Sequence, residues 1–201
     1  MDGARTYLIE REQWLDRPIE EVFAFYGDAT NLEAITPALL RFSVITPAPI
    51  AMGAGTLIDY RLRWRGVPLR WRTVIEAWEP PYRFIDRQLK GPYRLWHHTH
   101  TFEQQRGGTL IRDIVRYQLP FGWLGAAAHR LGVRRDLEAI FDHRALRVRE
   151  IFSEPGPGVR RGESPSWASD RPCGGRSACA EGRESPAEGE TPPSWGPAAR
   201  C

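Results

Sequence analysis

Residues 88–103 read Gln-Leu-Lys-Gly-Pro-Tyr-Arg-Leu-Trp-His-His-Thr-His-Thr-Phe-Glu, and from Trp96 onward the character of the side chains alternates. A period of two predicts a β-strand, whose successive side chains point to opposite faces of a sheet. The residues that then share one face are Trp96, His98, His100 and Phe102. Two imidazoles between two large aromatic rings are unusual for an ordinary hydrophobic core. We therefore expect this face to line a ligand cavity, or to carry a metal ion or catalytic chemistry.

Composition divides the chain into two parts, residues 1–153 and 154–201. The first part holds most of the aromatic and aliphatic residues and is long enough for a single hydrophobic core. The second part is rich in Pro, Gly and Ser and has almost no aliphatic residues. It cannot bury enough apolar surface to offset the entropy lost on ordering. We predict one domain over 1–153 and a disordered tail over 154–201.

The formal net charge of +3 is modest, and most arginines fall at alternating positions typical of a solvated sheet face. A nucleic-acid partner is therefore not expected, because such binders cluster their basic residues. All three cysteines, Cys173, Cys179 and Cys201, fall in the predicted tail, and their spacing is a poor zinc signal. The first residues have no apolar run behind a basic segment, so we expect no signal peptide. No stretch reaches the roughly 18 apolar residues that a membrane-spanning helix needs. We expect a cytoplasmic protein without stable membrane insertion, and the sequence does not indicate its oligomeric state.

The N-terminal part predicts one strand and two short helices. Residues 4–15 favour a strand, and Pro18 suits the first position of a helix with an apolar stripe. Thr30 and Glu33 have the spacing of a capping box and predict a second short helix that ends near Ile35.

Six strands in hairpin succession are expected next, separated by turns rich in Gly and Pro. Their predicted ranges are 40–46, 56–65, 69–78, 82–89, the strand that contains Trp96, and 109–119. From about Val133 to Phe152 the period becomes helical, which gives a helix of roughly 30 Å. Residues 120–125 predict a Gly-rich loop before it, in which Phe121 and Trp123 either form a lid or pack on the helix start. His129 and His143 are expected on a solvated helix face.

These elements predict an α+β fold in which a curved antiparallel sheet of about seven strands wraps around the long C-terminal helix. Arginine-bearing faces would point to water, and aromatic faces would point toward the helix.

Several motifs resemble those of the START-like helix-grip superfamily (SRPBCC), and in particular its polyketide cyclase/dehydrase-like ligand-binding proteins. The matching stretches are 31–37, 66–71, 80–84, 86–88, 91–93, 96–100 and 119–122. The resemblance covers roughly residues 4–153 and implies a helix-grip fold with an internal cavity. It does not imply one activity, because the superfamily spans lipid carriers, hormone receptors, aromatase/cyclases and oxygenase domains.

The inward faces mix large aromatics with a few polar groups, as small-molecule pockets do. The alternative is a filled core whose polar groups satisfy one another. In the pocket interpretation the aromatics supply affinity, while His98, His100, Gln88 and Asp113 orient the ligand. The candidate ligand contacts are Tyr60, Trp64, Trp71, Phe84, Gln88, Trp96, His98, His100, Tyr117 and Phe121.

Catalysis and metal binding are weaker interpretations of the same residues. The catalytic candidates are His98, His100 and Asp113, since a carboxylate (Asp86 or Asp113) beside an imidazole can support proton transfer. A buried His–Asp hydrogen bond that only orients strands is the interpretation we favour over catalysis, because buried polar groups need partners in any case. His-x-His beside a carboxylate also suits iron or zinc, but Glu103 lies on the opposite face, so no metal and no cofactor is predicted.

The sequence thus predicts binding of a small hydrophobic molecule, whether aromatic, polyketide-like or a lipid. A cyclase or dehydratase that uses an inward His/Asp pair is the alternative, and a metal-dependent His-x-His enzyme is the weaker third. The sequence indicates neither the identity of the ligand nor whether the protein turns it over.

Overall fold

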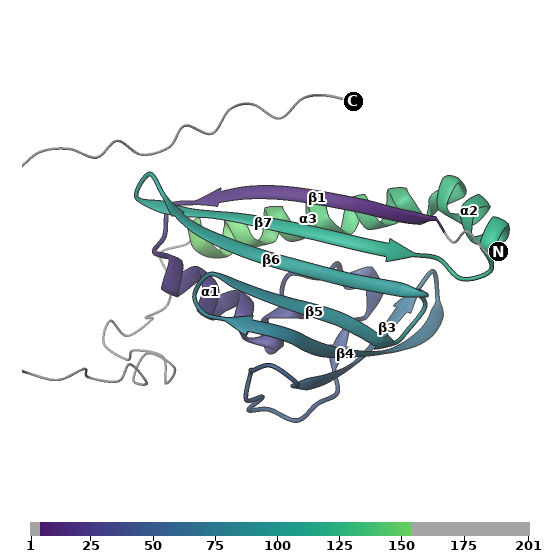
Figure 1. The fold of residues 1–201 in the computed structure, drawn as a ribbon, viewed down its shortest axis with the longest axis horizontal. Coiled ribbons are helices and arrows are strands. Elements are labelled where there is room, and N and C mark those ends of the chain that lie inside the picture. The colour runs from purple at the N-terminus through teal and green to yellow at the C-terminus, as the bar shows by residue number, and fades with distance from the viewer. Residues whose placement is uncertain (1–4, 154–201) are drawn as a thin grey trace, which may run out of the picture. The chain divides into compact units, whose positions relative to one another are not determined.

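The computed structural model describes residues 5–153, in which seven strands form one antiparallel sheet. The predicted tail lies outside the described residues. The sheet order is β1-β7-β6-β5-β4-β3-β2, so the chain meanders from β2 to β7 while β1 pairs with β7 (Figure 1). The strands are β1 (Thr6–Leu15), β2 (Ser43–Val44), β3 (Leu57–Trp64), β4 (Val67–Glu79), β5 (Arg83–Lys90), β6 (Leu95–Gln105) and β7 (Gly108–Gln118). The predicted α+β, helix-grip architecture is confirmed.

A short helix follows β1 and a long helix ends the described residues, as predicted. The helical elements are α1 (Ile19–Gly27), two 3-10 turns (Ala29–Leu32 and Ala38–Leu40), α2 (Gly122–Ala128), a π-helical turn (His129–Val133) and α3 (Arg134–Ser153). Figure 1 shows α3 running behind the sheet along β1, β7 and β6. Among the described residues, no helix combines the length and the apolar character that crossing a membrane requires.

The α3 helix is held to the sheet by apolar packing and by a side-chain bond. Leu137 and Phe141 pack with Val115 of β7 in one buried cluster. Near the other end of α3, Val148 packs in a second cluster that also contains residues of α1 and β7. The Gln13 amide donates to the backbone carbonyl of Ala145 at 2.9 Å. These contacts place the apolar stripe of the helix over the sheet face that the alternation identified.

The burial of β6 alternates as predicted. Its buried side chains are Trp96, His98, His100 and Phe102. His97 points the other way, and its Nε2 lies 3.7 Å from Glu76. The period of two therefore assigned the faces correctly, because a strand buried on one side must keep its register to bury its apolar set.

The predicted capping box is wrong. The Asp28 carboxylate caps the 3-10 turn instead, accepting from the Thr30 backbone N–H at 2.9 Å and from the Thr30 hydroxyl at 2.6 Å. Glu33 does not reach back, because its Oε1 accepts from the Val44 backbone N–H at 2.8 Å. The expected helix to Ile35 is shortened to one turn, and strand β2 is shorter than predicted.

The predicted loop over 120–125 is also corrected, since α2 occupies most of it. Three consecutive alanines favour a helix and outweigh the glycines. Gly125 allows close packing, because a Cβ there would lie 2.3 Å from the Pro120 carbonyl oxygen. Phe121 and Trp123 do not pack on the helix start, and 80% and 78% of their respective side-chain surfaces are exposed.

His129 is buried at the junction of α2 and α3, which corrects the expected solvated position. Its ring stacks on Tyr7 with centroids 3.6 Å apart, and its Nε2 lies 2.8 Å from the Tyr117 hydroxyl. Burial, followed by the charges of Arg134 and Arg5, lowers the pKa of His129. The imidazole is therefore held neutral between β1, β7 and the start of α3.

Replacing His129 by Gln should remove a pH-dependent part of the stability. A lowered folded-state pKa means that the unfolded chain binds the proton more tightly, so this contribution is present above about pH 6.5 and is lost as the pH falls. Each unit of pKa difference corresponds to about 1.4 kcal/mol. Urea denaturation near pH 7.5 and near pH 5 should show that the stability advantage of wild type over His129→Gln shrinks at the lower pH. A constant advantage over His129→Gln would contradict the assignment.

Candidate functional site

A cavity of about 360 Å³ lies between the sheet and α3, within the range typical of small-molecule sites. Seven of the ten predicted ligand contacts line it. They are Tyr60, Trp64, Trp71, Phe84, Trp96, His98 and His100. The alternation thus placed most of the proposed contacts around one space.

The other three predicted contacts do not line this cavity. Gln88 folds back on the β5–β6 turn, where its amide nitrogen donates to the Tyr93 carbonyl at 2.6 Å. Tyr117 is buried beside His129. Phe121 is exposed at the start of α2. Strand parity places Gln88 and Tyr117 on the inner side, but it does not say how far along each strand the cavity extends.

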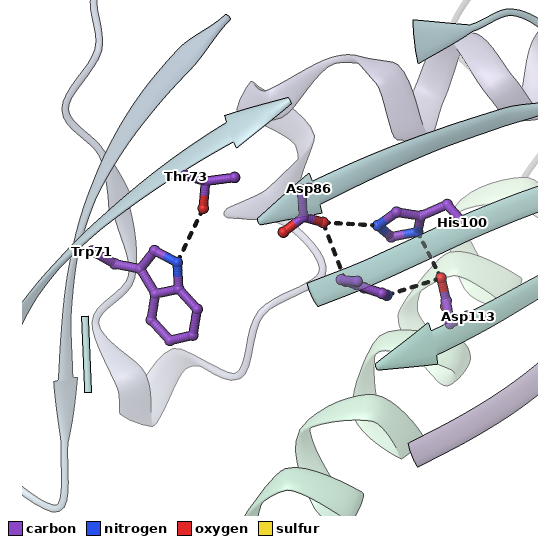
Figure 2. Close-up of polar contacts among 6 residues, drawn as sticks. Trp71, Thr73, Asp86, His100 and Asp113 are labelled. Carbon is purple, nitrogen blue, oxygen red and sulfur yellow. Dashed lines mark hydrogen bonds and ion pairs between the residues drawn. The ribbon is translucent and has the colours of Figure 1, made fainter. Parts of the chain in front are cut away.

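The rest of the wall is apolar and comes from elements that the sequence suggested only as core. The residues between α1 and β3 supply one side, and the stripe of α3 supplies the other. The main apolar contributors are Leu32, Ile35, Leu40, Phe42, Met52, Leu137, Ile140 and Phe141. Among the aromatics, Trp71 packs edge-on against Trp96 at 5.2 Å, and its indole N–H donates to the Thr73 hydroxyl at 3.0 Å. Figure 2 shows Trp71 and Thr73 joined by this hydrogen bond on β4. The indole N–H of Trp71 therefore has a partner, while its ring remains part of the cavity wall.

The polar pole of the cavity is a cluster of four ionisable side chains from three adjacent strands, which we call the His–Asp cluster. It consists of Asp86 on β5, His98 and His100 on β6, and Asp113 on β7. The strand register creates it, because Asp86 lies opposite His98 and His100 lies opposite Asp113. Figure 2 shows Asp86 and Asp113 on either side of His100.

Each imidazole of the cluster contacts both carboxylates. His98 Nδ1 lies 3.3 Å from Asp86 Oδ2, and His98 Nε2 lies 3.3 Å from Asp113 Oδ1. His100 Nε2 lies 3.2 Å from Asp86 Oδ2, and His100 Nδ1 lies 2.6 Å from Asp113 Oδ1. The two imidazole rings are 3.7 Å apart between centroids. The cluster is therefore a closed cycle in which one oxygen of each carboxylate faces two nitrogens.

Burial and charge oppose each other in the cluster, and charge prevails. Burial alone would raise the pKa of Asp86 and of Asp113, but the neighbouring imidazoles hold both well below the usual carboxyl range. Burial alone would lower the pKa of His98, but Asp86 and Asp113 together raise it. Both carboxylates are thus ionised at neutral pH and require positive charge nearby.

Hydrogen bonding within the cluster is incomplete. Of the four nitrogen–oxygen contacts, only that between His100 Nε2 and Asp86 Oδ2 has hydrogen-bond geometry. Three buried atoms of the cluster have no hydrogen-bond partner among residues 5–153, namely His98 Nε2, His100 Nδ1 and Asp113 Oδ1. Such atoms in a buried site require an explanation, for which an ion or a water molecule is the usual one.

Arg144 and Tyr26 complete the polar surroundings, and the sequence analysis identified neither as a site residue. Arg144 lines the cavity from α3, and its buried Nε has no hydrogen-bond partner within the described part of the chain. Its guanidinium carbon lies 5.2 Å from the Phe141 ring centroid. Tyr26 lies near His100, and burial followed by the charge of Asp113 raises its pKa. The signal for Arg144 was its position seven residues after Leu137, on the apolar stripe of the helix.

The chain is similar to known proteins both in sequence pattern and in fold. Residues 15–142 match the model of a family described as polyketide cyclase / dehydrase and lipid transport. No curated protein matches the chain. Among solved structures, TTHA0849 from Thermus thermophilus has 21% identity and a TM-score of 0.53, and the match covers 71% of this chain and 97% of that one. Protein CV1439 from Chromobacterium violaceum has 13% identity and a TM-score of 0.56, with 72% and 96% covered.

One similar structure carries a functional description. The di-domain ARO/CYC StfQ from the steffimycin biosynthetic pathway has 14% identity and a TM-score of 0.55. The match covers 74% of this chain and 51% of StfQ. At these identities the solved structures show a shared fold and no more.

Replacing Asp113 by Asn should destabilise the domain by about 3 kcal/mol, because it leaves buried imidazole charge without its partner. The matched control is Asp142→Asn on α3, whose carboxylate is 63% exposed and contacts Arg11 at 3.1 Å. That control should cost less than about 1 kcal/mol. Urea denaturation followed by circular dichroism measures both, and equal effects would show that the cluster does not carry buried charge.

Proposed function

This chain belongs to the polyketide cyclase / dehydrase and lipid transport family, and we propose that it binds a small hydrophobic molecule between the sheet and α3. The observation that carries the proposal is the cavity of about 360 Å³, whose walls are mostly aromatic and aliphatic. Burial of apolar ligand surface against such walls contributes roughly 25 cal/mol per Å². Aromatic, polyketide-like and lipid ligands all fit this chemistry.

The polar groups of the cavity favour a ligand that also carries oxygen. Arg144 offers a buried Nε donor without a partner in the described residues, and the imidazoles of His98 and His100 face the same space. A carbonyl, phenol or carboxylate at one end of the ligand would accept from these groups, and its apolar body would lie on Trp71 and Trp96. Such convergent polar groups set orientation in an otherwise apolar pocket.

The charges on the outer face of the sheet argue against a nucleic-acid partner. Several of its arginines are paired with carboxylates on neighbouring strands. The pairs are Arg72 with Asp59, Arg87 with Glu76, and Arg112 with Glu12. Paired arginines do not form the continuous basic stripe by which nucleic acids are bound.

A cyclase- or dehydratase-type activity is the second candidate, and the cluster is the observation that favours it. His98 and His100 line the cavity, and each contacts both Asp86 and Asp113. An imidazole beside a ligand carbonyl can remove an α-proton and return it to oxygen, and general acid–base catalysis of this kind contributes about 10²–10⁴-fold.

Ligand binding should depend on the aromatic wall. Anilinonaphthalene sulfonate is a suitable probe, because it combines fused aromatic rings with one anionic group. We expect one molecule to bind per chain, with the affinity reduced about tenfold or more in Trp71→Ala through lost apolar contact. Trp14→Ala is the matched control, since Trp14 lies on β1, is 43% exposed and does not line the cavity. Fluorescence titration of folded protein measures both, and equal affinities would place the probe elsewhere.

Proton abstraction can be tested with α-tetralone, an aryl ketone, in deuterated buffer. If the second candidate is correct, wild-type protein accelerates exchange of the α-protons, and His98→Gln and His100→Gln each reduce that rate about 10²-fold. Binding of anilinonaphthalene sulfonate should be largely retained in both variants. His97→Gln should keep the full rate, because that side chain points to the other face. Exchange at the rate of buffer alone in wild type would remove this candidate and leave ligand binding standing.

A further inference from the structure

Three potential ligand atoms converge at the cavity end of the His–Asp cluster. Asp86, His98 and His100 each offer one ligand atom, and these three atoms all lie within 4.8 Å of one another. The Asp86 oxygen is 3.3 Å from the His98 nitrogen and 3.2 Å from the His100 nitrogen. A tetrahedral zinc site with bonds of about 2.0–2.2 Å separates its donors by about 3.4 Å. Both distances from the Asp86 oxygen are therefore close to those expected between ligands of one ion.

Asp113 lies at the opposite end of both imidazoles. Its Oδ1 is 2.6 Å from His100 Nδ1 and 3.3 Å from His98 Nε2. Neither contact has hydrogen-bond geometry, but a carboxylate oxygen 2.6 Å from His100 Nδ1 makes that nitrogen the electrostatically favoured place for the ring proton. The same carboxylate favours a proton on His98 Nε2. In the neutral imidazoles the remaining lone pairs are then those on the Asp86 side. A carboxylate behind a histidine is the usual arrangement around metal-binding imidazoles.

The two ends of the cluster also differ in what they face. Asp86, His98 and His100 line the cavity of about 360 Å³. Asp113 does not, and instead borders a small space of about 30 Å³ beside α3. An ion at the Asp86 end would therefore keep open coordination positions toward the cavity, as catalytic sites do.

At the Asp86 end one carboxylate oxygen faces two imidazole nitrogens. His98 Nδ1 and His100 Nε2 both face Asp86 Oδ2, and only the His100 contact has hydrogen-bond geometry. Coordination of an ion would replace that one hydrogen bond, while His98 Nδ1 has no hydrogen bond to Asp86 to lose. A divalent ion there would also bring two positive charges to the two buried carboxylates.

The geometry points to a binding site for a divalent transition-metal ion such as Zn²⁺ or Fe²⁺, with Asp86, His98 and His100 as ligands and Asp113 as the group that orients both imidazoles. Two imidazoles and one carboxylate with open positions suit these ions. This reverses the expectation of no metal, which considered Glu103 as the carboxylate. The inference does not depend on the proposed function, because metal binding and binding of anilinonaphthalene sulfonate are measured separately.

The test is metal titration of the full chain after chelator treatment and dialysis. Calorimetry with Zn²⁺ should show one site per chain that is weakened about 10²-fold or more in Asp86→Asn and in His100→Gln. Asp113→Asn should weaken it about 10-fold to 10²-fold, as expected for a group that orients ligands. His97→Gln, which changes a neighbouring imidazole on the opposite face, should bind Zn²⁺ within about threefold of wild type.

The absorption spectrum of bound Co²⁺ distinguishes this site from a site formed by the cysteines. The spectrum of the wild-type protein is sufficient for this comparison. Co²⁺ should produce the intense visible bands of a four-coordinate site without the near-ultraviolet band of thiolate ligation. A thiolate band that disappears when Cys173, Cys179 and Cys201 are all replaced by Ser would assign the metal to those residues and overturn the inference. It is also overturned by Zn²⁺ affinity that is unchanged in folded Asp86→Asn and His100→Gln, or by wild-type affinity weaker than about millimolar.

Discussion

The mutual compensation of two buried carboxylates and two imidazoles is the interaction on which the site depends. Each of these charges alone would be strongly unfavourable in an apolar interior. Together they are tolerated, because every imidazole contacts both Asp86 and Asp113. The arrangement requires β5, β6 and β7 to keep one register, since a shift by one residue would turn the side chains to the outer face. The cluster therefore links the pairing of the central strands to the chemistry of the cavity.

The cavity persists because apolar clusters surround it without filling it. One cluster joins α1 to Phe84, Phe102 and Val148, and another joins Trp96 and Val115 to the first half of α3. A third packs Ile58, Tyr60 and Ile75 on β3 and β4. Register shifts in β4 next to Thr73 and Ile75 accompany the curvature of the sheet there, as β-bulges do. The space between these clusters is bordered by rigid aromatic rings, which hold a ligand surface in place before a ligand binds.

Ligand binding, proton transfer and metal binding all involve the same polar pole, but they depend on different features of it. The proposed ligand binding would require the aromatic wall around Trp71 and would gain orientation from Arg144. The proposed proton transfer would require an imidazole that is free to exchange a proton with a molecule in the cavity. The proposed metal binding would require Asp86 specifically, because that carboxylate lies on the cavity side of His98 and His100. Substitutions at these different residues can therefore distinguish the three proposed activities.

The sequence is sufficient to predict the α+β class, the order of the strands, the long C-terminal helix and the inward face of β6. These follow from periodicity, which strand and helix geometry impose locally. It also identified the four members of the cluster as candidates, but it could not choose between Asp86 and Asp113, and it missed Arg144. The alternation along a strand predicts which face of the sheet a side chain occupies. It does not predict which side chain lies next to it on the adjacent strand. The contact of both carboxylates with both imidazoles could not be predicted, because strand register brings together residues that are distant in the chain. The fold also shows that Gln88 folds back to Tyr93 and that α2 replaces a loop.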